Sequence, residues 1–283
     1  MVSVKQANVE LFDKIYPLLQ KFDNPNLSIQ DFRRLFTLVW KTEQAGCGYV
    51  LIDGEEVVGF LGMLFSEKRI GNQKFPYCNL CTWIVLEEYR KFSLLLFKPL
   101  FALKNHVITN MTPAPSLIPI FEKFGYKVLE TERQLYWASL WGGWSMKWKI
   151  ADDVQLIESK LNHHDLEIFC NHQALACRHL IIYDQSKYCY LVFVPATARR
   201  IVIRSSIYYV SDMEIYLKVL NRVQWYLATR YRSCYTVIDR RFTKNFPTLL
   251  GLKRPAIRLY LADQLPTEQI DNLYSELVVL PLS

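Results

Sequence analysis

Three landmarks in the first half of this chain recur in the second half at a nearly constant separation. They are a hairpin turn, a strand that runs into a helix, and a glycine after a helix, seen at Asp53 and Asp184, Val85 and Val210, and Gly125 and Gly251. The separations are 131, 125 and 126 residues. Spacing this regular predicts a tandem duplication, in which each half folds on the same plan.

Hydrophobic periodicity within each half predicts alternating helices and strands. In the first half the expected helices cover 7–21, 28–40, 93–104 and 115–124, and the expected strands cover 49–52, 57–65, 77–86, 106–110 and 126–137. The second half repeats a hairpin (179–183 and 188–194), a strand (200–210), a helix (214–229) and a strand (233–239). We therefore expect an α/β protein with two domains, each a twisted mixed β-sheet flanked by helices. The aromatic segment 137–148, which contains Gly142 and Gly143, suggests a boundary between residues 1–140 and 141–283.

Composition narrows the class of protein. With 283 residues, 51% of them hydrophobic and 22% charged, the chain can fill two ordinary cores and is not disordered. Seven cysteines without an export signal suggest reduced thiols, and no apolar run is long enough to span a membrane, so we expect a cytoplasmic protein without a membrane span. The net charge of +7 includes arginines gathered in the second half. We interpret them as a solvated basic face, which does not favour a nucleic-acid partner.

Two segments of the first half, 85–96 (VLEEYRKFSLLL) and 121–128 (FEKFGYKV), carry a family resemblance. The first passes from a strand through a charged segment into a helix, and the second closes a short helix on Gly125. Together they resemble the GNAT superfamily of acyl-CoA-dependent N-acyltransferases. The resemblance implies an N-acyltransferase that moves an acyl group, with acetyl-CoA or another acyl-CoA as the donor, to a small-molecule amine or a peptide amine.

The same resemblance implies where the cofactor binds. Main-chain groups of the splayed strand would contact the pantetheine arm, the turn after it would hold the diphosphate, and an asparagine at the end of the next strand would contact pantetheine. The corresponding residues here are Ile84, Val85 and Leu86, then Arg90, Lys91, Phe92, Ser93 and Leu94, and finally Asn110. Backbone N–H groups at a helix N-terminus suit a pyrophosphate. The equivalent segment of the second half, 211–214, has two acidic residues, so we expect acyl-CoA only in the first domain.

The sequence departs from the family mildly at Ser93, which stands in place of a glycine, and more strongly at three other positions. Leu95 stands where a small residue lets the phosphates approach, Phe121 stands where many members have a proton-donating tyrosine, and Asn79 stands near a strand carboxylate that acts as a base. A phenyl ring and an amide cannot do that proton chemistry. No catalytic residue is therefore assigned, and Asn79 and Cys81 remain as candidates, Cys81 either as an acyl-accepting thiol or as a core side chain.

Two other functions stay open. One is a catalytically inactive tandem GNAT-fold protein that binds or regulates. The other is an enzyme like the Fem-type or aminoacyl transferases, or like N-myristoyltransferase, which also pair two such folds. Cysteines and histidines at 78–81 and 163–179 have metal-like spacing, but each set lies on a segment where such residues are common in cores, and we expect no metal.

Overall fold

The computed structural model describes the chain except for residues 23, 25–26, 38–39, 41, 43–45, 72, 140–146, 199–200, 244–250, 264 and 283. The chain forms two compact units. Unit 1 contains Met1–Leu129, Ile257–Ile270 and Tyr274–Leu280, and unit 2 contains Glu130–Ala256, Asp271–Leu273 and Pro281–Ser283. The boundary predicted between 140 and 141 lies outside the described residues, as do Gly142, Gly143, Arg199 and Arg200.

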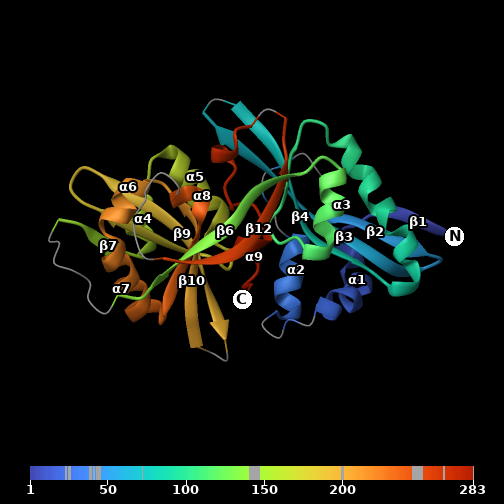
Figure 1. Cartoon of the computed structure of the whole chain (residues 1–283), viewed down its shortest axis with the longest axis horizontal. Helices are drawn as coiled ribbons and strands as arrows, with labels where there is room; N and C mark the ends of the chain where they lie inside the picture. The colour runs from blue at the N-terminus through green and yellow to red at the C-terminus, as the bar shows by residue number, and fades with distance from the viewer. Residues whose placement is uncertain are drawn as a thin grey trace. The chain divides into compact units, whose positions relative to one another are not determined.

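Unit 1 is built on a mixed sheet (Figure 1). Its strands, in spatial order, are β1 (Val2–Gln6), β2 (Gly48–Asp53), β3 (Glu56–Ile70), β4 (Gln73–Val85), β5 (Val107–Asn110) and the end of β12 (Leu252–Leu261). Neighbours are antiparallel except β4 and β5, which are parallel. The turn between β2 and β3 uses Gly54 at φ +63°, as the Asp53–Gly54 pair predicts.

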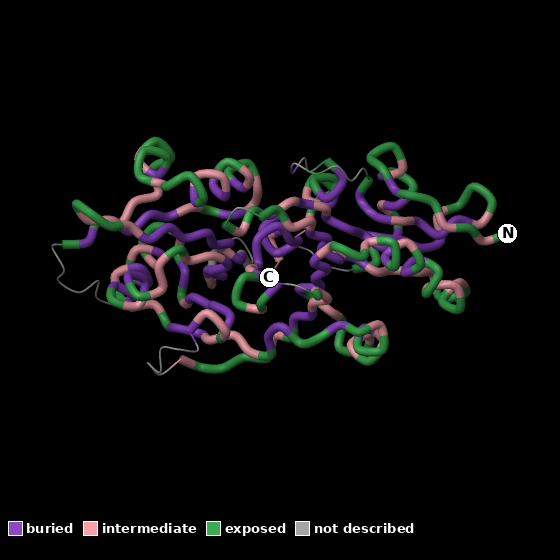
Figure 2. The backbone as a smooth tube through the Cα atoms, turned by 90° about the horizontal axis from the view of Figure 1, so that it is seen from above, coloured by how far each residue is buried: buried purple, intermediate pink, exposed green. Residues whose placement is uncertain are grey.

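Helical segments cover the sheet of unit 1. They are η1 (Val9–Leu11), α1 (Phe12–Leu19), η2 (Gln20–Phe22), α2 (Ile29–Thr37), η3 (Glu87–Ala102), η4 (Pro115–Leu117), α3 (Ile118–Lys123), η5 (Thr267–Gln269) and α9 (Glu276–Val279), where η marks 3₁₀ geometry. On one face Phe36 of α2 stacks on Phe60 of β3, with ring centroids 5.5 Å apart. On the other face Phe97 and Phe121 pack in one cluster with Leu80. The buried stretches of the backbone run through the interior in Figure 2, and the exposed ones form the outer helices and loops.

The helix expected over 93–104 begins earlier in the chain and has 3₁₀ geometry instead of α geometry. It is the 3₁₀ helix η3, which starts at Glu87, directly after Leu86 leaves the strand with φ −57° and ψ 147°. Glu87 and Glu88 occupy its first turn, where carboxylates interact favourably with the helix dipole. The charged residues that the sequence suggests as a turn are therefore helical.

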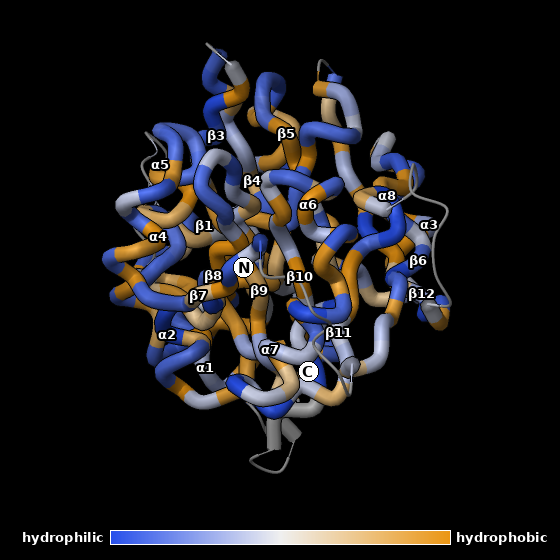
Figure 3. The backbone as a smooth tube through the Cα atoms, turned by 90° about the vertical axis from the view of Figure 1, so that its left-hand side faces the viewer, coloured by the Kyte–Doolittle hydropathy of each residue, from blue (hydrophilic) through white to orange (hydrophobic). Residues whose placement is uncertain are grey.

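Unit 2 repeats this plan. Its strands follow the order β6 (Lys127–Trp137), β11 (Tyr235–Asp239), β10 (Ile201–Val210), β9 (Tyr188–Ala198), β8 (Arg178–Tyr183) and β7 (Lys149–Ala151), and its helices are α4 (Val154–Lys160), α5 (His163–His172), α6 (Met213–Lys218), α7 (Leu220–Tyr231) and α8 (Arg240–Thr243). Only β10 and β11 are parallel. Hydrophobic residues follow β8 and β9 in Figure 3, and they enter one core cluster with α6 and α7. The predicted α/β class, with a mixed arrangement of strands and flanking helices in each unit, is confirmed.

The duplication extends to a local irregularity. In β4 the pairing with β3 shifts between Gly62–Thr82 and Met63–Leu80, so Cys81 is an extra residue, a β-bulge. In β10 the pairing with β9 shifts between Ile207–Phe193 and Tyr209–Val192, so Tyr208 is the extra residue. Each bulge lies on the strand of its unit that has a parallel neighbour. Two bulges at matching places support the predicted tandem repeat.

Among the described residues, no helix has the length and the apolar character needed to cross a membrane.

Candidate functional site

The strands β4 and β5 of unit 1 separate into a fork. They pair only from Tyr77–Val107 to Asn79–Thr109, although β4 continues to Val85. The Cys81 bulge lies just beyond the last pair and turns β4 away from β5. Since β3 takes one edge of β4, the other edge past Asn79 has no strand partner in the described part of the chain. The fork therefore presents main-chain hydrogen-bonding groups to a ligand.

The predicted pantetheine contacts lie at the fork. Ile84, Val85 and Leu86 are partly exposed at the end of β4. Asn110 ends β5, is buried, and accepts a hydrogen bond at its side-chain oxygen from the Thr112 backbone N–H at 3.3 Å. The structure thus brings these residues to one end of the sheet, with Asn110 already holding the loop that follows it.

The predicted diphosphate segment, 90–94, lies within η3. In a 3₁₀ helix each N–H bonds to the carbonyl three residues earlier, so these backbone groups are engaged. Arg90 and Lys91 are exposed, Arg90 lies 3.6 Å from Glu87, and the Lys91 ammonium lies 5.1 Å from the Phe92 ring centre. A phosphate at this segment would meet cationic side chains.

A buried carboxylate that sequence reasoning missed lies beside Asn79. Glu276, the first residue of α9, is 1% exposed. The Asn79 side-chain amide donates to its Oε2 at 2.5 Å, and the Thr112 hydroxyl donates to its Oε1 at 2.7 Å. The Thr109 hydroxyl donates to the Asn79 carbonyl at 3.0 Å, which fixes the orientation of the amide. Glu276 lies 197 positions from Asn79 in sequence, and no motif or spacing links them.

The surroundings of Glu276 hold its pKa above the ordinary value of a glutamate. Burial raises the pKa of this carboxyl, and the hydrogen bonds from Thr112 and Asn79 and the charge of Arg258 lower it by less. Burial, followed by the charge of Glu276, also raises the pKa of the Cys81 thiol. Cys81 is therefore a protonated thiol at neutral pH, and it lacks the lowered pKa of an activated nucleophile.

The backbone before Glu276 is in an unfavourable conformation. Tyr274 has φ +55°, in the left-handed region that non-glycine residues adopt rarely. It is buried, and its ring packs edge-on against Trp40 with centroids 5.1 Å apart. Ser275 then caps α9, accepting the N–H of Leu277 at its hydroxyl at 3.3 Å. Packing thus holds the segment that delivers Glu276 to the sheet, as is common near functional sites.

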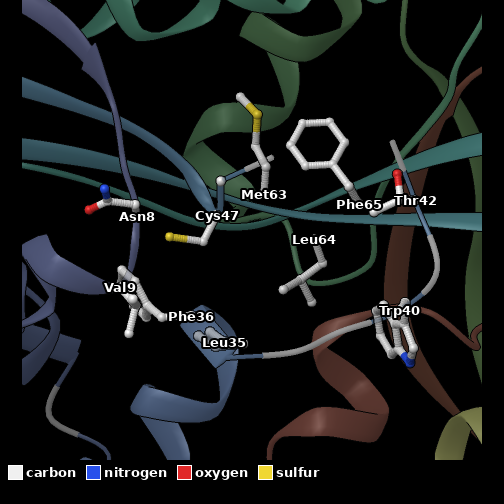
Figure 4. Close-up of a pocket in the computed structure, with 11 residues that line it drawn as sticks. Asn8, Val9, Leu35, Phe36, Trp40, Thr42, Cys47, Met63, Leu64 and Phe65 are labelled. Atoms are coloured by element: carbon white, nitrogen blue, oxygen red, sulfur yellow. The ribbon is translucent and has the colours of Figure 1, made fainter. Parts of the chain in front are cut away.

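A pocket of about 330 Å³ opens between α2 and β3 on the Asn79 face of the sheet. Figure 4 shows Leu64 on one side of β3, toward Leu35 and Phe36, and Met63 and Phe65 on the other side. Leu64 is the register partner of Asn79. None of the lining residues that the structure describes carries a charge, and burial raises the pKa of the Cys47 thiol to about 12. The pocket suits an uncharged group, with mainly apolar side chains and the polar Asn8 and Thr42 in its lining.

Trp40 connects this pocket to the Glu276 segment. It lines the pocket and also packs on Tyr274, two residues before Glu276. Glu276 and Cys47 both contribute to the raised pKa of the Cys81 thiol, and Cys47 also lines the pocket. The pocket, the bulge and the buried carboxylate therefore form one neighbourhood.

Phe121 belongs to the hydrophobic core. It is 1% exposed and makes edge contacts with Trp83, Phe97 and Tyr126, with ring centroids 6.0, 5.6 and 5.1 Å away.

The cysteines and histidines with metal-like spacing in unit 2 have local partners. His179 Nδ1 is hydrogen-bonded to the Tyr190 hydroxyl at 2.7 Å, and the Cys177 sulfur lies 3.9 Å from His179 Nε2. No group of three or more His, Cys, Asp or Glu in the described ranges is arranged to hold a metal ion.

Solved structures share this fold. A conserved protein of unknown function from Enterococcus faecalis, described as a probable N-acyltransferase, matches with a TM-score of 0.62 and 12% identity over 94% of this chain and 74% of its own. A GCN5-related N-acetyltransferase from Anabaena variabilis matches at 0.60 and 12% identity over 92% and 72%. A tandem GNAT protein from the clavulanic acid biosynthesis pathway matches at 0.55 and 10% identity over 92% and 98%. No family model matches the sequence, and no curated protein matches it. The predicted GNAT-like fold is confirmed.

Proposed function

We propose that unit 1 is an N-acyltransferase that uses acetyl-CoA or another acyl-CoA. The β4–β5 fork carries this proposal, because it offers an unpaired strand edge beside the Cys81 bulge. The pantetheine arm would lie along this edge, bonded to the main chain of Ile84, Val85 and Leu86 and near Asn110. Its diphosphate would reach Arg90 and Lys91, with Phe92, Ser93 and Leu94 in the same helix.

The pocket beside α2 is the proposed place for the acceptor. Its uncharged lining favours an amine that carries an apolar group over a polyamine or an acidic peptide. Polar groups at the fork, rather than the pocket, would handle the reacting nitrogen. We further propose that the protein acts in the cytoplasm.

Unit 2 is not expected to bind acyl-CoA. At its corresponding strand end, Asp212 caps α6 by accepting the N–H of Ile215 at 2.9 Å. The carboxylate thus occupies a helix start at which a pyrophosphate would otherwise bind, and it repels anions.

A second candidate function is a binding protein without catalysis. Asn79 in place of a carboxylate and the buried Phe121 favour it. The two functions share the cofactor site but differ in turnover. Incubation with acetyl-CoA and a panel of amines separates them: arylalkylamines should be acetylated faster than spermidine, whereas bound acetyl-CoA without any product would indicate a binding protein.

Binding of acetyl-CoA should depend on the two cations of η3. Arg90→Glu/Lys91→Glu should weaken binding by about 1–3 kcal/mol, the range for charge-assisted contacts. Isothermal calorimetry measures this change. Lys98→Glu/Lys104→Glu is the matched control, because it reverses two exposed cations in or next to the same helix, and its affinity should stay near that of the wild type. Equal affinities of all three proteins would mean that the diphosphate binds elsewhere.

A further inference from the structure

The first half of the chain provides no carboxylate at Asn79, yet a carboxylate is present there. It comes from Glu276, and it is held by two side-chain hydrogen bonds, one from Asn79 of β4 and one from Thr112, two residues beyond the end of β5. Burying a carboxylate costs free energy unless hydrogen-bond partners replace the water that it loses. The backbone of Tyr274, at φ +55°, adds to the cost of bringing it there.

Thr112 joins this carboxylate to the surface. Glu276 is 1% exposed, whereas Thr112 is exposed and lies two residues beyond the end of β5, at the open end of the fork. A hydroxyl donates one hydrogen bond and can accept two. Since the Thr112 hydroxyl donates to Glu276, its lone pairs remain able to accept from a nitrogen at the fork.

We propose that Thr112 and Glu276 form a proton relay that serves as the base of the acyl transfer. This inference rests on the proposed function. The neutral acceptor nitrogen attacks the thioester carbonyl, and a C–N bond forms. Its proton passes to the Thr112 oxygen while the Thr112 proton passes to Glu276 Oε1. The C–S bond then breaks, and the proton returns through the same hydroxyl to the CoA thiolate, so that the products are the amide and CoA.

The charges around Glu276 are compatible with this role. Arg258 of β12 is buried and donates to the carbonyl of Met111 at 2.9 Å, and its positive charge lowers the pKa of Glu276 by less than burial raises it. Cys81 of β4 is a protonated thiol. The charges of α2, which packs on α9, are paired at the surface, as Asp31–Arg34 at 2.7 Å and Arg33–Asp13 at 3.2 Å. A carboxyl with a pKa above its ordinary value is a stronger base for this step.

The test compares Glu276→Gln, Thr112→Val and Thr112→Ser in the full chain. Glu276→Gln and Thr112→Val should each lower the rate of acetyl transfer by about 10²- to 10⁴-fold, the usual contribution of a general base. The acetyl-CoA dissociation constant should stay within about twofold of the wild type, because neither residue is expected to contact the diphosphate or pantetheine. Thr112→Ser keeps the hydroxyl and should keep most of the rate.

Asp165→Asn is the matched control for loss of a buried carboxylate. Asp165 of unit 2 is 2% exposed and accepts two tyrosine hydroxyls, from Tyr188 and Tyr209, each at 2.7 Å. Its substitution should reduce stability but leave acetyl-CoA binding and transfer unchanged. A Glu276→Gln protein that loses stability to a similar extent and keeps its rate would overturn the relay.

Two measurements remain decisive if the acceptor differs from the amines tried. Slow hydrolysis of bound acetyl-CoA uses water as the acceptor and should also fall in Glu276→Gln and Thr112→Val. Infrared titration of the Glu276 carboxyl, identified by its absence in Glu276→Gln, should show a raised pKa that rises further in Thr112→Val. A titration unchanged by Thr112→Val would disprove the relay. Absent acetyl-CoA binding in the wild type would instead refute the proposed function.

Discussion

Asn79 and Glu276 form a neutral–acidic pair inside unit 1. The side-chain nitrogen of Asn79 donates to the Glu276 carboxylate, and the side-chain oxygen of Asn79 accepts from the Thr109 hydroxyl. This arrangement depends on the donor character of the amide nitrogen. A carboxylate at position 79, which the family resemblance would suggest, would face the Glu276 oxygens directly.

Asn79→Asp should therefore destabilise the protein instead of activating it. Two buried carboxylates in hydrogen-bond contact retain a proton, so the pair has a raised pKa in the folded state. The shared proton therefore contributes to the free energy of unfolding of Asn79→Asp at a pH below the ordinary carboxyl pKa. This contribution is lost as the pH rises through the raised pKa of the folded state. At neutral pH we expect a loss of about 3–5 kcal/mol, as for an uncompensated buried charge.

Urea unfolding of Asn79→Asp at several pH values measures this loss. Asn110→Asp is the matched control, because the side-chain oxygen of Asn110 is already an acceptor, for the Thr112 N–H. Its unfolding free energy should change little with pH. A similar pH dependence of both variants would show that the Asn79–Glu276 contact is not the cause.

The fork is a property of a whole strand. The register between β4 and β3 shifts by one residue at the Cys81 bulge. The pairing between β4 and β5 ends two residues earlier, at Asn79. Gly62 lies opposite the bulge, where an added Cβ would be 2.9 Å from the Cys81 sulfur and 3.1 Å from Thr82 Cβ. The absence of a side chain at Gly62 therefore leaves room for the bulged residue.

Gly62→Ala and Cys81→Ala should be energetically coupled. Since the closest atom to the new methyl group is the Cys81 sulfur, removing that sulfur should make Gly62→Ala less costly by about 0.5 kcal/mol or more. A double-mutant cycle of unfolding free energies measures the coupling. Cys78→Ala is the control, because Cys78 lies on the same strand and packs in the core cluster that contains Phe97 and Phe121. Additive effects of Gly62→Ala and Cys81→Ala would contradict the packing of the bulge.

At the scale of the whole molecule, neither unit is one continuous stretch of chain. The end of β12 and the α9 segment come from the second half of the sequence but belong to unit 1, and most of β6 comes from the first half but belongs to unit 2. The segments that cross over are well buried: Leu259, Val278 and Val279 are each 0% exposed. Each such side chain contributes about 1.5–3 kcal/mol by burial.

A fragment of residues 1–140 should therefore lack a cooperative unfolding transition in circular dichroism. Addition of a peptide of residues 257–280 should restore the transition. The same peptide with Leu259→Asp is the control, and it should restore little, because a charge would then face the core cluster of unit 1. Cooperative unfolding of residues 1–140 alone would show that the crossing segments are dispensable.

Local sequence patterns determined much of this protein. The hairpin turn at Asp53–Gly54 and the helix and strand periodicities follow from residues close together in the chain. Steric and hydrogen-bonding preferences of this kind act over a few residues, so the sequence contains them directly. The same patterns also led to the fold that the solved structures share.

Tertiary structure alone decided the rest. Glu276 contacts Asn79 across 197 residues, and only the tertiary packing of α9, which also contacts α2, brings them together. Pairing of the β12 end with β5 joins distant segments in the same way. The winding of η3 places Arg90 to Leu94 in a helix where a turn is expected. Such contacts depend on which surfaces bury one another in three dimensions, and a single sequence has no spacing that marks them.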